Sequence, residues 1–229
     1  METPVADRPF VVLNMACTLD GKIGLPGKRP LKLSSEEDFA RVHRLRSEAQ
    51  AVVVGIETVL ADDPKLTVKE EYVPDGSSPL RVVLDSTGRV PREAAVLDGA
   101  AATLIVTVEE VSGTFPNAET LRCGEGEIDL VRLVDRLFDR GVHQILVEGG
   151  GTVAWSFLRA GLVDRFHVYI APWAMGDDRA PSLLAGNTVD GLADMQGLRL
   201  REVTVLGEGL LVTYQPVERA AGTGKARGS

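Results

Sequence analysis

The stretch Ile145-Leu146-Val147-Glu148-Gly149-Gly150-Gly151-Thr152 decides the fold of this chain. Its three apolar residues are typical of the end of a buried strand, and residues 153–158 indicate the start of a helix. Glycines in such a turn let backbone N–H groups approach a ligand with no Cβ atom in the way. The N-terminus of the following helix adds partial positive charge, so the turn predicts a phosphate site. Glu148 ends the strand, where open α/β sheets bind their ligands. The alternative is a tight turn without a ligand, for which one glycine would suffice.

Composition narrows the protein class. With 229 residues, of which 44% are hydrophobic and 25% charged, the chain can bury a sizeable core. Its net charge of −8, without a basic stripe, argues against nucleic acid as a partner. The sequence contains neither a signal peptide nor an apolar run that could span a bilayer. Cys17 and Cys123 lie far apart and form no CxxC pair. We therefore predict a cytoplasmic protein without a membrane segment or a metal site.

Strand and helix patterns alternate along the first half of the chain. Ser34 and Glu37 have capping-box spacing at the start of the clearest helix, which spans 34–50. Asn14 interrupts an apolar first strand and therefore requires a polar partner. Asp62-Asp63-Pro64 predicts a turn. Strands are predicted over residues 10–17, 51–56, 81–86, 96–97 and 102–108.

In the second half of the chain, strand and helix patterns continue to alternate and are then followed by a hairpin. Asp129 caps a helix that ends at Gly141, and 112–126 is predicted to be a loop with one short element. After the glycine turn we expect a helix, a strand and a C-terminal hairpin, over 153–160, 166–171, and 198–205 with 210–214. The pattern predicts a single α/β domain with a mostly parallel central sheet, an antiparallel C-terminal edge and helices on both faces. We place the domain at 9–217, after an N-terminal extension (1–8) and before a disordered tail (218–229).

Six motifs, in order over nearly the whole chain, resemble the pyrimidine reductases of riboflavin biosynthesis, whose domain has a dihydrofolate-reductase-like fold. They are Thr18-Leu19-Asp20-Gly21-Lys22-Ile23, Val42-His43-Arg44-Leu45-Arg46, Thr58-Val59-Leu60-Ala61-Asp62-Asp63-Pro64-Lys65-Leu66-Thr67-Val68, Arg81-Val82-Val83-Leu84-Asp85-Ser86, Val147-Glu148-Gly149-Gly150-Gly151-Thr152 and Gly161-Leu162-Val163-Asp164.

The resemblance implies NADPH-dependent reduction of a 5-amino-6-ribosylamino-pyrimidine 5′-phosphate to its ribitylamino product, by a homodimer. Reduction of the imine form requires a hydride at C1′ and a proton on the neighbouring nitrogen, while the protein positions both ligands and excludes water. The turn is not a GxGxxG fingerprint, so a Rossmann fold is disfavoured. By similarity, the NADPH site would consist of Ala16, Thr58, Asp62, Ser86, Gly149, Gly150, Gly151 and Thr152.

The resemblance also assigns a substrate side. Arg46 and Lys69 fall on basic positions suited to a phosphomonoester, although arginine is common where Lys69 stands. Lys32 in a basic loop is a third candidate cation, and Leu66 would line the pocket. Glu148 would contact the substrate, either at the ribosyl hydroxyls or at the imine nitrogen; otherwise it caps the amides of the glycine turn. His43 has no second histidine nearby and is expected to be a packing or solvent residue.

Asn14 is the second candidate catalytic residue, beside Glu148. Family members fused to a deaminase commonly have lysine here, whereas stand-alone archaeal and fungal-type reductases tend to have asparagine. Lysine only donates hydrogen bonds, while asparagine can also accept one from an exocyclic amine. The chain has no H-x-E followed by P-C-x-x-C, the deaminase signature. We therefore hypothesise that the substrate is the 2,5-diamino-pyrimidinone, reduced before deamination.

Three alternatives remain at this stage. The substrate could be the deaminated 5-amino-6-ribosylamino-uracil phosphate, or the chain could be a dihydrofolate-reductase-like enzyme for another heterocycle. It could also be a nucleotide-binding regulator without catalysis. A regulator would be expected to lose the polar groups of the substrate side, yet Asn14, Arg46, Lys69 and Glu148 are all present.

Overall fold

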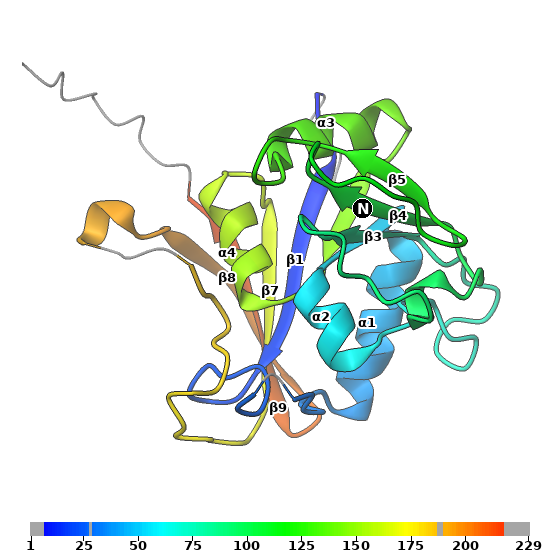
Figure 1. Ribbon diagram of the computed structural model, residues 1–229. Helices are drawn as coiled ribbons and strands as arrows, with labels where there is room; N and C mark the ends of the chain where they lie inside the picture. The colour runs from blue at the N-terminus through cyan, green and yellow to red at the C-terminus, as the bar shows by residue number, and fades with distance from the viewer. Residues whose placement is uncertain (1–6, 28, 187–189, 218–229) are drawn as a thin grey trace, which may run out of the picture.

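The structure is a computed structural model, which describes residues 7–27, 29–186 and 190–217. These residues form a nine-stranded sheet in the order β5-β4-β3-β2-β6-β1-β7-β9-β8 (Figure 1). The strands are β1 (Phe10–Cys17), β2 (Ala51–Gly55), β3 (Leu80–Leu84), β4 (Thr103–Thr107), β5 (Glu119–Arg122), β6 (Gln144–Val147), β7 (Arg165–Ile170), β8 (Leu198–Leu206) and β9 (Gly209–Pro216). The helices are α1 (Glu36–Glu48), α2 (Ile56–Asp62), α3 (Leu130–Asp139) and α4 (Gly151–Arg159), with short 3₁₀ turns η1 (Ala95–Leu97) and η2 (Leu192–Asp194).

Strands β1 to β7 run parallel, and β9 joins β7 to β8 by antiparallel pairing. The central strand β1 lies between β6 and β7, which come more than 130 residues later in the chain. Residues of α3 and α4 pack on one face of the sheet, and residues of α1 and α2 pack on the other. Strands covered on both faces need continuous apolar runs, which β2 and β4 supply. The predicted fold class is confirmed.

The strand predicted at 96–97 is wrong. Val96 and Leu97 are buried in the 3₁₀ turn η1. The N–H of Leu97 donates to the Ala94 carbonyl at 2.8 Å, and the N–H of Ala95 donates to Asp63 Oδ1 at 2.7 Å. Local turn bonds therefore take the backbone groups that a strand would offer to a neighbour.

The helix N-cap predicted at Ser34 is shifted by one residue. Helix α1 begins at Glu36, and Ser35 is the N-cap, whose Oγ accepts from the N–H of Asp38 at 3.3 Å. Ser34 instead donates its hydroxyl to the carboxylate of Asp38. Asp38 is fully buried, so the first turn of α1 uses both serines to satisfy one residue.

The segment before Pro64 is a helix, α2, as well as the turn that the sequence indicated. Helix α2 begins directly after β2 and ends at Asp62, and its C-cap Asp63 has a φ of 41°, in the left-handed region that closes helices. Thr58 and Asp62 are four residues apart and therefore share one face of α2. The helix predicted at 153–160 likewise begins earlier, at Gly151, so the third glycine belongs to the first turn of α4.

The boundaries of the predicted domain are only partly covered. Within the predicted extension, Arg8 forms an ion pair with Asp164 at 2.6 Å, so this residue packs on the domain. Residues 1–6 and the tail predicted at 218–229 lie outside the described residues. None of the helices in the described ranges is long and apolar enough to cross a membrane.

Candidate functional site

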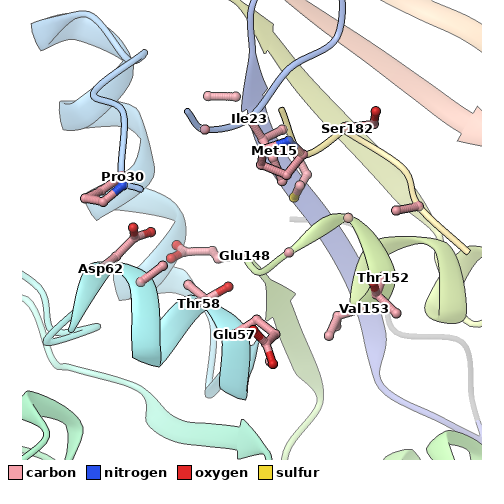
Figure 2. Close-up of a pocket in the computed structure, with 18 of the residues that line it drawn as sticks. Met15, Ile23, Pro30, Glu57, Thr58, Asp62, Glu148, Thr152, Val153 and Ser182 are labelled. Carbon is pink, nitrogen blue, oxygen red and sulfur yellow. The ribbon is translucent and has the colours of Figure 1, made fainter. Parts of the chain in front are cut away.

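A cavity of about 540 Å³ opens at the carboxyl ends of the parallel strands. Asn14 and Ala16 contribute from β1, Leu84 ends β3, and Glu148 follows β6. Figure 2 shows Thr58 and Asp62 on α2, Glu148 on the turn after β6, and Thr152 and Val153 at the start of α4. Eight of the residues predicted from sequence line this cavity: Asn14, Ala16, Thr58, Asp62, Glu148, Gly150, Gly151 and Thr152.

Each of the three positions in the turn requires glycine for a different steric reason. A Cβ on Gly149 would lie 2.8 Å from the Val54 Cα, so only glycine lets the turn pack against β2. Gly150 has a φ of 65°, which L side chains rarely adopt. A Cβ on Gly151 would lie 2.3 Å from the Ser182 carbonyl oxygen. Three glycines are thus required by the packing of the turn itself.

The turn also offers unpaired donors to the cavity. Within the described ranges, no protein group accepts from the N–H groups of Gly151, Thr152 and Val153, as expected for the first turn of a helix. All three residues line the cavity. A helix start with free N–H groups and no Cβ at its first position is suited to an oxyanion such as a phosphate.

Replacing Gly151 by alanine is expected to destabilise the protein by about 1–3 kcal/mol, the usual cost of overpacking. The clash is with backbone, because the segment 182–185 crosses the start of α4 and the Ala185 N–H donates to the Gly151 carbonyl at 3.1 Å. Chemical denaturation would measure the change. Gly191→Ala is the control, since Gly191 has an extended φ of −171° and open space around it. Equal stability of Gly151→Ala and wild type would show that 182–185 can move away without cost.

Asp62 and Thr58 form the α2 side of the cavity. The Asp62 side chain is exposed to solvent, yet the surrounding protein removes part of its hydration and raises the pKa of its carboxyl group above the ordinary value. The Thr58 Oγ1 lies 3.5 Å from the position that a Cβ on Gly150 would take, so this hydroxyl faces the glycine turn directly. A hydroxyl and a carboxyl therefore stand opposite the free N–H groups of α4.

Glu148 and Arg46 form a bidentate ion pair. Arg46 Nε lies 2.9 Å from Glu148 Oε1, and its Nη2 lies 2.7 Å from Oε2. Arg46 Nη1 also donates to the Thr67 carbonyl at 3.3 Å. Both side chains are largely buried, with 16% and 8% of their surface exposed. Burial alone would lower the pKa of the Arg46 guanidinium. The charge and hydrogen bonds of Glu148 outweigh this effect, so the pKa lies above its ordinary value.

The pair changes the interpretation of both residues. Glu148 lines the cavity, and among the described residues its two oxygens accept from Arg46 and not from the amides of its own turn. The guanidinium of Arg46 is bound to Glu148 and lies outside the set of cavity-lining residues. Its direct contact with a substrate phosphate therefore stays a prediction, whereas its contact with Glu148 is observed.

Five other predicted residues do not line the cavity. Lys69 is exposed and pairs with Glu71 at 3.1 Å, and Lys32 lies over the Phe39 ring. Leu66 is buried in the core, with a φ of 55°. Ser86 follows the end of β3, and Gly149 is buried against β2. The roles assigned to these residues by resemblance stay predictions.

His43 is a packing residue, as expected. Its ring stacks on Tyr72 at 4.8 Å between centroids, and its Nδ1 accepts from the N–H of Lys69 at 3.2 Å. It is 2% exposed, and burial, with the charges of Arg46 and Lys69, lowers the pKa of its imidazole despite the opposing charges of Glu148 and Glu71. The neutral ring thus holds the segment at Lys69 against α1.

Acid should weaken this contact. Since the folded pKa of His43 is lowered, its contribution to stability is complete above the unfolded value of about 6.5 and is lost as pH falls below it. One such group changes the unfolding free energy by at most about 1.4 kcal/mol per pH unit. Denaturation of wild type and His43→Gln between pH 8 and about pH 5 would test this. The stability advantage of wild type should shrink on acidification, while exposed His143→Gln should follow wild type throughout. A constant difference would contradict the prediction.

The wall of the cavity opposite α2 was not predicted from the sequence. This wall is formed by Ile23, Gly24, Pro181, Ser182 and Ala185. Backbone bonds join its two segments, from the N–H of Ile23 to Pro181 O at 2.9 Å and from the N–H of Leu183 to Gly21 O at 2.8 Å. No local pattern could have identified 181–185, because its place is set by partners about 160 residues away. Within the described residues, no cluster of three His, Cys, Asp or Glu side chains could hold a metal ion.

Comparison with known proteins gives consistent results. The 2,5-diamino-6-ribosylamino-4(3H)-pyrimidinone 5′-phosphate reductase of Methanothermobacter thermautotrophicus is 42% identical over 212 residues, covering 90% of this chain and 98% of that protein. The reductase of the same name from Archaeoglobus fulgidus is 39% identical and covers 90% and 97%. The solved structure of Acinetobacter baumannii RibD matches with a TM-score of 0.77 and 25% identity, over 93% of this chain and 59% of RibD. The family model described as the RibD C-terminal domain matches residues 9–212. The chain therefore belongs to the RibD C-terminal domain family.

Proposed function

We propose that the chain is an NADPH-dependent reductase that converts 2,5-diamino-6-ribosylamino-4(3H)-pyrimidinone 5′-phosphate to its ribitylamino product. Two relatives at 42% and 39% identity carry the name of this reductase. The observation that carries the proposal is the cavity itself, in which free N–H groups of α4 stand near a fixed carboxylate and the Asn14 amide. A cytoplasmic location, as predicted from sequence, accompanies this proposal.

The hydrogen-bond donors at the start of α4 suit the pyrophosphate of a dinucleotide cofactor. The N–H groups of Gly151, Thr152 and Val153 supply the donors that a pyrophosphate requires, and Thr58 and Ala16 border the same space. Asp62 would hold a polar group of the cofactor opposite them. When bound, the nicotinamide supplies the hydride that reduces C1′. The choice of NADPH over NADH rests on the resemblance alone.

The chain's own residues would orient the substrate and exclude water. Arg46 fixes both oxygens of Glu148, so this carboxylate faces the cavity in one orientation and can accept from ribosyl hydroxyls or from a protonated imine nitrogen. Met15, Ile23, Leu84 and Val153 give the cavity an apolar lining. Such a lining strengthens the electrostatic contacts made within it.

Anaerobic NADPH oxidation, followed by loss of its absorbance, tests the proposal. The 2,5-diamino compound, the deaminated 5-amino-6-ribosylamino-uracil phosphate and dihydrofolate are offered separately. Turnover of the diamino compound above the others supports the proposal. Preference for the deaminated compound would keep the reductase and reject its substrate. Turnover of dihydrofolate alone, or of nothing while NADPH still binds, would replace the proposal by one of the two remaining alternatives.

As part of this proposal, the chain forms a homodimer through the exposed strand β8. Strand β8 lies at the end of the sheet (Figure 1). Its residues are exposed apart from the half-buried Leu206. Leu200, Val203 and Val205, which are 55%, 52% and 74% exposed, form an apolar row on this strand. Exposed apolar side chains on the last strand of a sheet offer a surface that a second copy of the chain can cover.

Val205→Glu is expected to convert the dimer to a monomer at micromolar concentration, because it places a charge in the apolar row. Light scattering after gel filtration would measure the mass. Thr204→Glu is the matched control, since the side chain of Thr204 projects from the opposite face of β8. A wild-type monomer, or a dimer insensitive to Val205→Glu, would reject this surface.

A further inference from the structure

Asn14 borders the cavity from the central strand. It is 7% exposed, and its neighbour in the β1–β7 register is His167. The amide of an asparagine has two different ends, an oxygen that accepts and a nitrogen that donates two hydrogen bonds. The end that faces the cavity therefore decides which ligand atoms this residue can recognise.

Arg41 decides the orientation. Its Nη2 lies 2.7 Å from Asn14 Oδ1. A guanidinium has five N–H donors and no acceptor, so the atom that meets it must be the amide oxygen. The reverse orientation would bring N–H groups of the amide against N–H groups of a cation. Arg41 thus removes the usual ambiguity between the oxygen and nitrogen of the amide.

Arg41 is itself held in place. Its Nε lies 2.9 Å from Asp38 Oδ1, and its Nη2 lies 2.7 Å from the same oxygen. Asp38 is fully buried in the first turn of α1, and its other oxygen accepts from the Ser34 hydroxyl. The Arg41 side chain is 13% exposed. A chain of charge-assisted bonds therefore runs from the start of α1 to the centre of the sheet.

The other end of the Asn14 amide is left for a ligand. Within the described part of the chain, Nδ2 has no hydrogen-bond partner, while the residue lines the cavity. We infer that Arg41 is a positioning residue, which holds the Asn14 amide so that its NH₂ group faces the cavity and donates to an acceptor on the substrate.

This inference rests on the proposed function for the identity of that acceptor. The 2-amino group of the proposed substrate is a donor in an aminopyrimidinone, and an NH₂ group does not pair with it. Asn14 would instead donate to a ring nitrogen or to the ring carbonyl. The hypothesis drawn from the sequence, in which Asn14 accepts from an exocyclic amine, would instead use the second lone pair of the oxygen that already accepts from Arg41.

Asn14→Asp separates the two interpretations. The new carboxylate keeps an oxygen against Arg41 and presents a second oxygen, an acceptor, to the cavity. If Asn14 donates, kcat/KM for the diamino substrate should fall by about 100-fold, as expected when a polar contact is reversed. Retention of kcat/KM within a factor of about 3 would overturn the inference, because a carboxylate cannot donate the hydrogen bond that the inference assigns to the NH₂ group. Unchanged thermal unfolding shows that the variant is folded.

A double-mutant cycle tests whether Arg41 acts through Asn14. Arg41→Met should lower kcat/KM by about 10-fold in wild type but by less than about twofold in the Asn14→Ala background. Arg41→Lys, which keeps a cationic donor, should recover part of the loss. Arg44→Met, an exposed arginine on the same helix, is the control and should have no effect. An equal loss in both backgrounds would assign Arg41 a structural role and overturn the inference.

The orientation can also be measured without turnover. The side-chain NH₂ signals of Asn14 in a proton–nitrogen NMR spectrum are identified by their absence in Asn14→Asp. They should shift in Arg41→Met and not in Arg44→Met; the same signals in all three proteins would contradict the Arg41 contact. If wild type reduces neither pyrimidine, the proposed function fails, and this spectrum still decides whether Arg41 orients Asn14.

Discussion

Glu148→Gln is expected to lower kcat/KM by at least about 100-fold and to destabilise the protein by about 2–3 kcal/mol. The stability loss arises because the charge of Arg46, 16% exposed, would face a neutral amide in a largely buried position. The loss of activity arises because the carboxylate that borders the cavity loses its charge and its fixed orientation. Urea denaturation and NADPH oxidation measure the two effects separately.

Arg46→Met completes a cycle with Glu148→Gln. Each single change leaves one partner buried without its counter-charge, so the double variant should be less destabilised than the sum of the two. Glu119→Gln is the control, because its pair with Arg140 is also bidentate but largely exposed, and it should cost less than about 1 kcal/mol. Additive stability losses in the Arg46–Glu148 cycle would contradict the coupling seen in the structure.

Arg81→Met should be the most destabilising single change, at about 3–5 kcal/mol. Arg81 is fully buried in β3 and forms an ion pair with Asp98 at 2.9 Å. It also donates to the Thr103 hydroxyl at 2.9 Å and to the carbonyls of Lys65, Ala95 and Ala101 at 3.3, 3.4 and 2.7 Å. Methionine fills much of the volume but leaves these acceptors without a donor.

The change at Arg81 has a second expected effect, on activity. The Lys65 carbonyl belongs to the segment after α2, so its release should loosen the helix that carries Thr58 and Asp62. Denaturation and the KM for NADPH measure the two consequences. Arg132→Met is the control, since Arg132 is 46% exposed and lies 3.9 Å from Glu109. A stability loss below about 1 kcal/mol would show that water replaces the guanidinium.

The sequence predicted those parts of the fold that short patterns determine. Apolar runs located the parallel strands except β5, which lies in the segment 112–126 that was predicted as a loop with one short element, and Asp129 and Gly141 marked the start and end of α3 as caps. The glycine turn was located correctly because its geometry depends on adjacent residues. At 96–97 the pattern failed, since a buried apolar pair has the same composition in a strand and in a 3₁₀ turn.

The residues of the site were predicted in two ways. Glu148 lies at the end of a strand that the apolar pattern located, whereas Thr58 and Asp62 were assigned by the family resemblance and lie on α2, a helix that the sequence did not predict; all three line the cavity. The partners of the polar groups were not predictable. The pairing of Arg46 with Glu148 joins residues 102 positions apart, and that of Arg41 with Asn14 joins residues 27 apart. Each requires the relative placement of α1 and the sheet, which no local pattern contains.

The position of β1 has a consequence for the newly made chain. Its first residue, Phe10, pairs with Gln144 of β6. During synthesis on a ribosome, the central strand therefore cannot pair with β6 until more than 130 further residues have been added. At 5–20 residues per second this takes roughly 7 to 27 s. During that time an eight-residue apolar segment lacks both of its native neighbours. We therefore expect the risk of aggregation to be greatest during synthesis, before β1 has paired with β6 and β7.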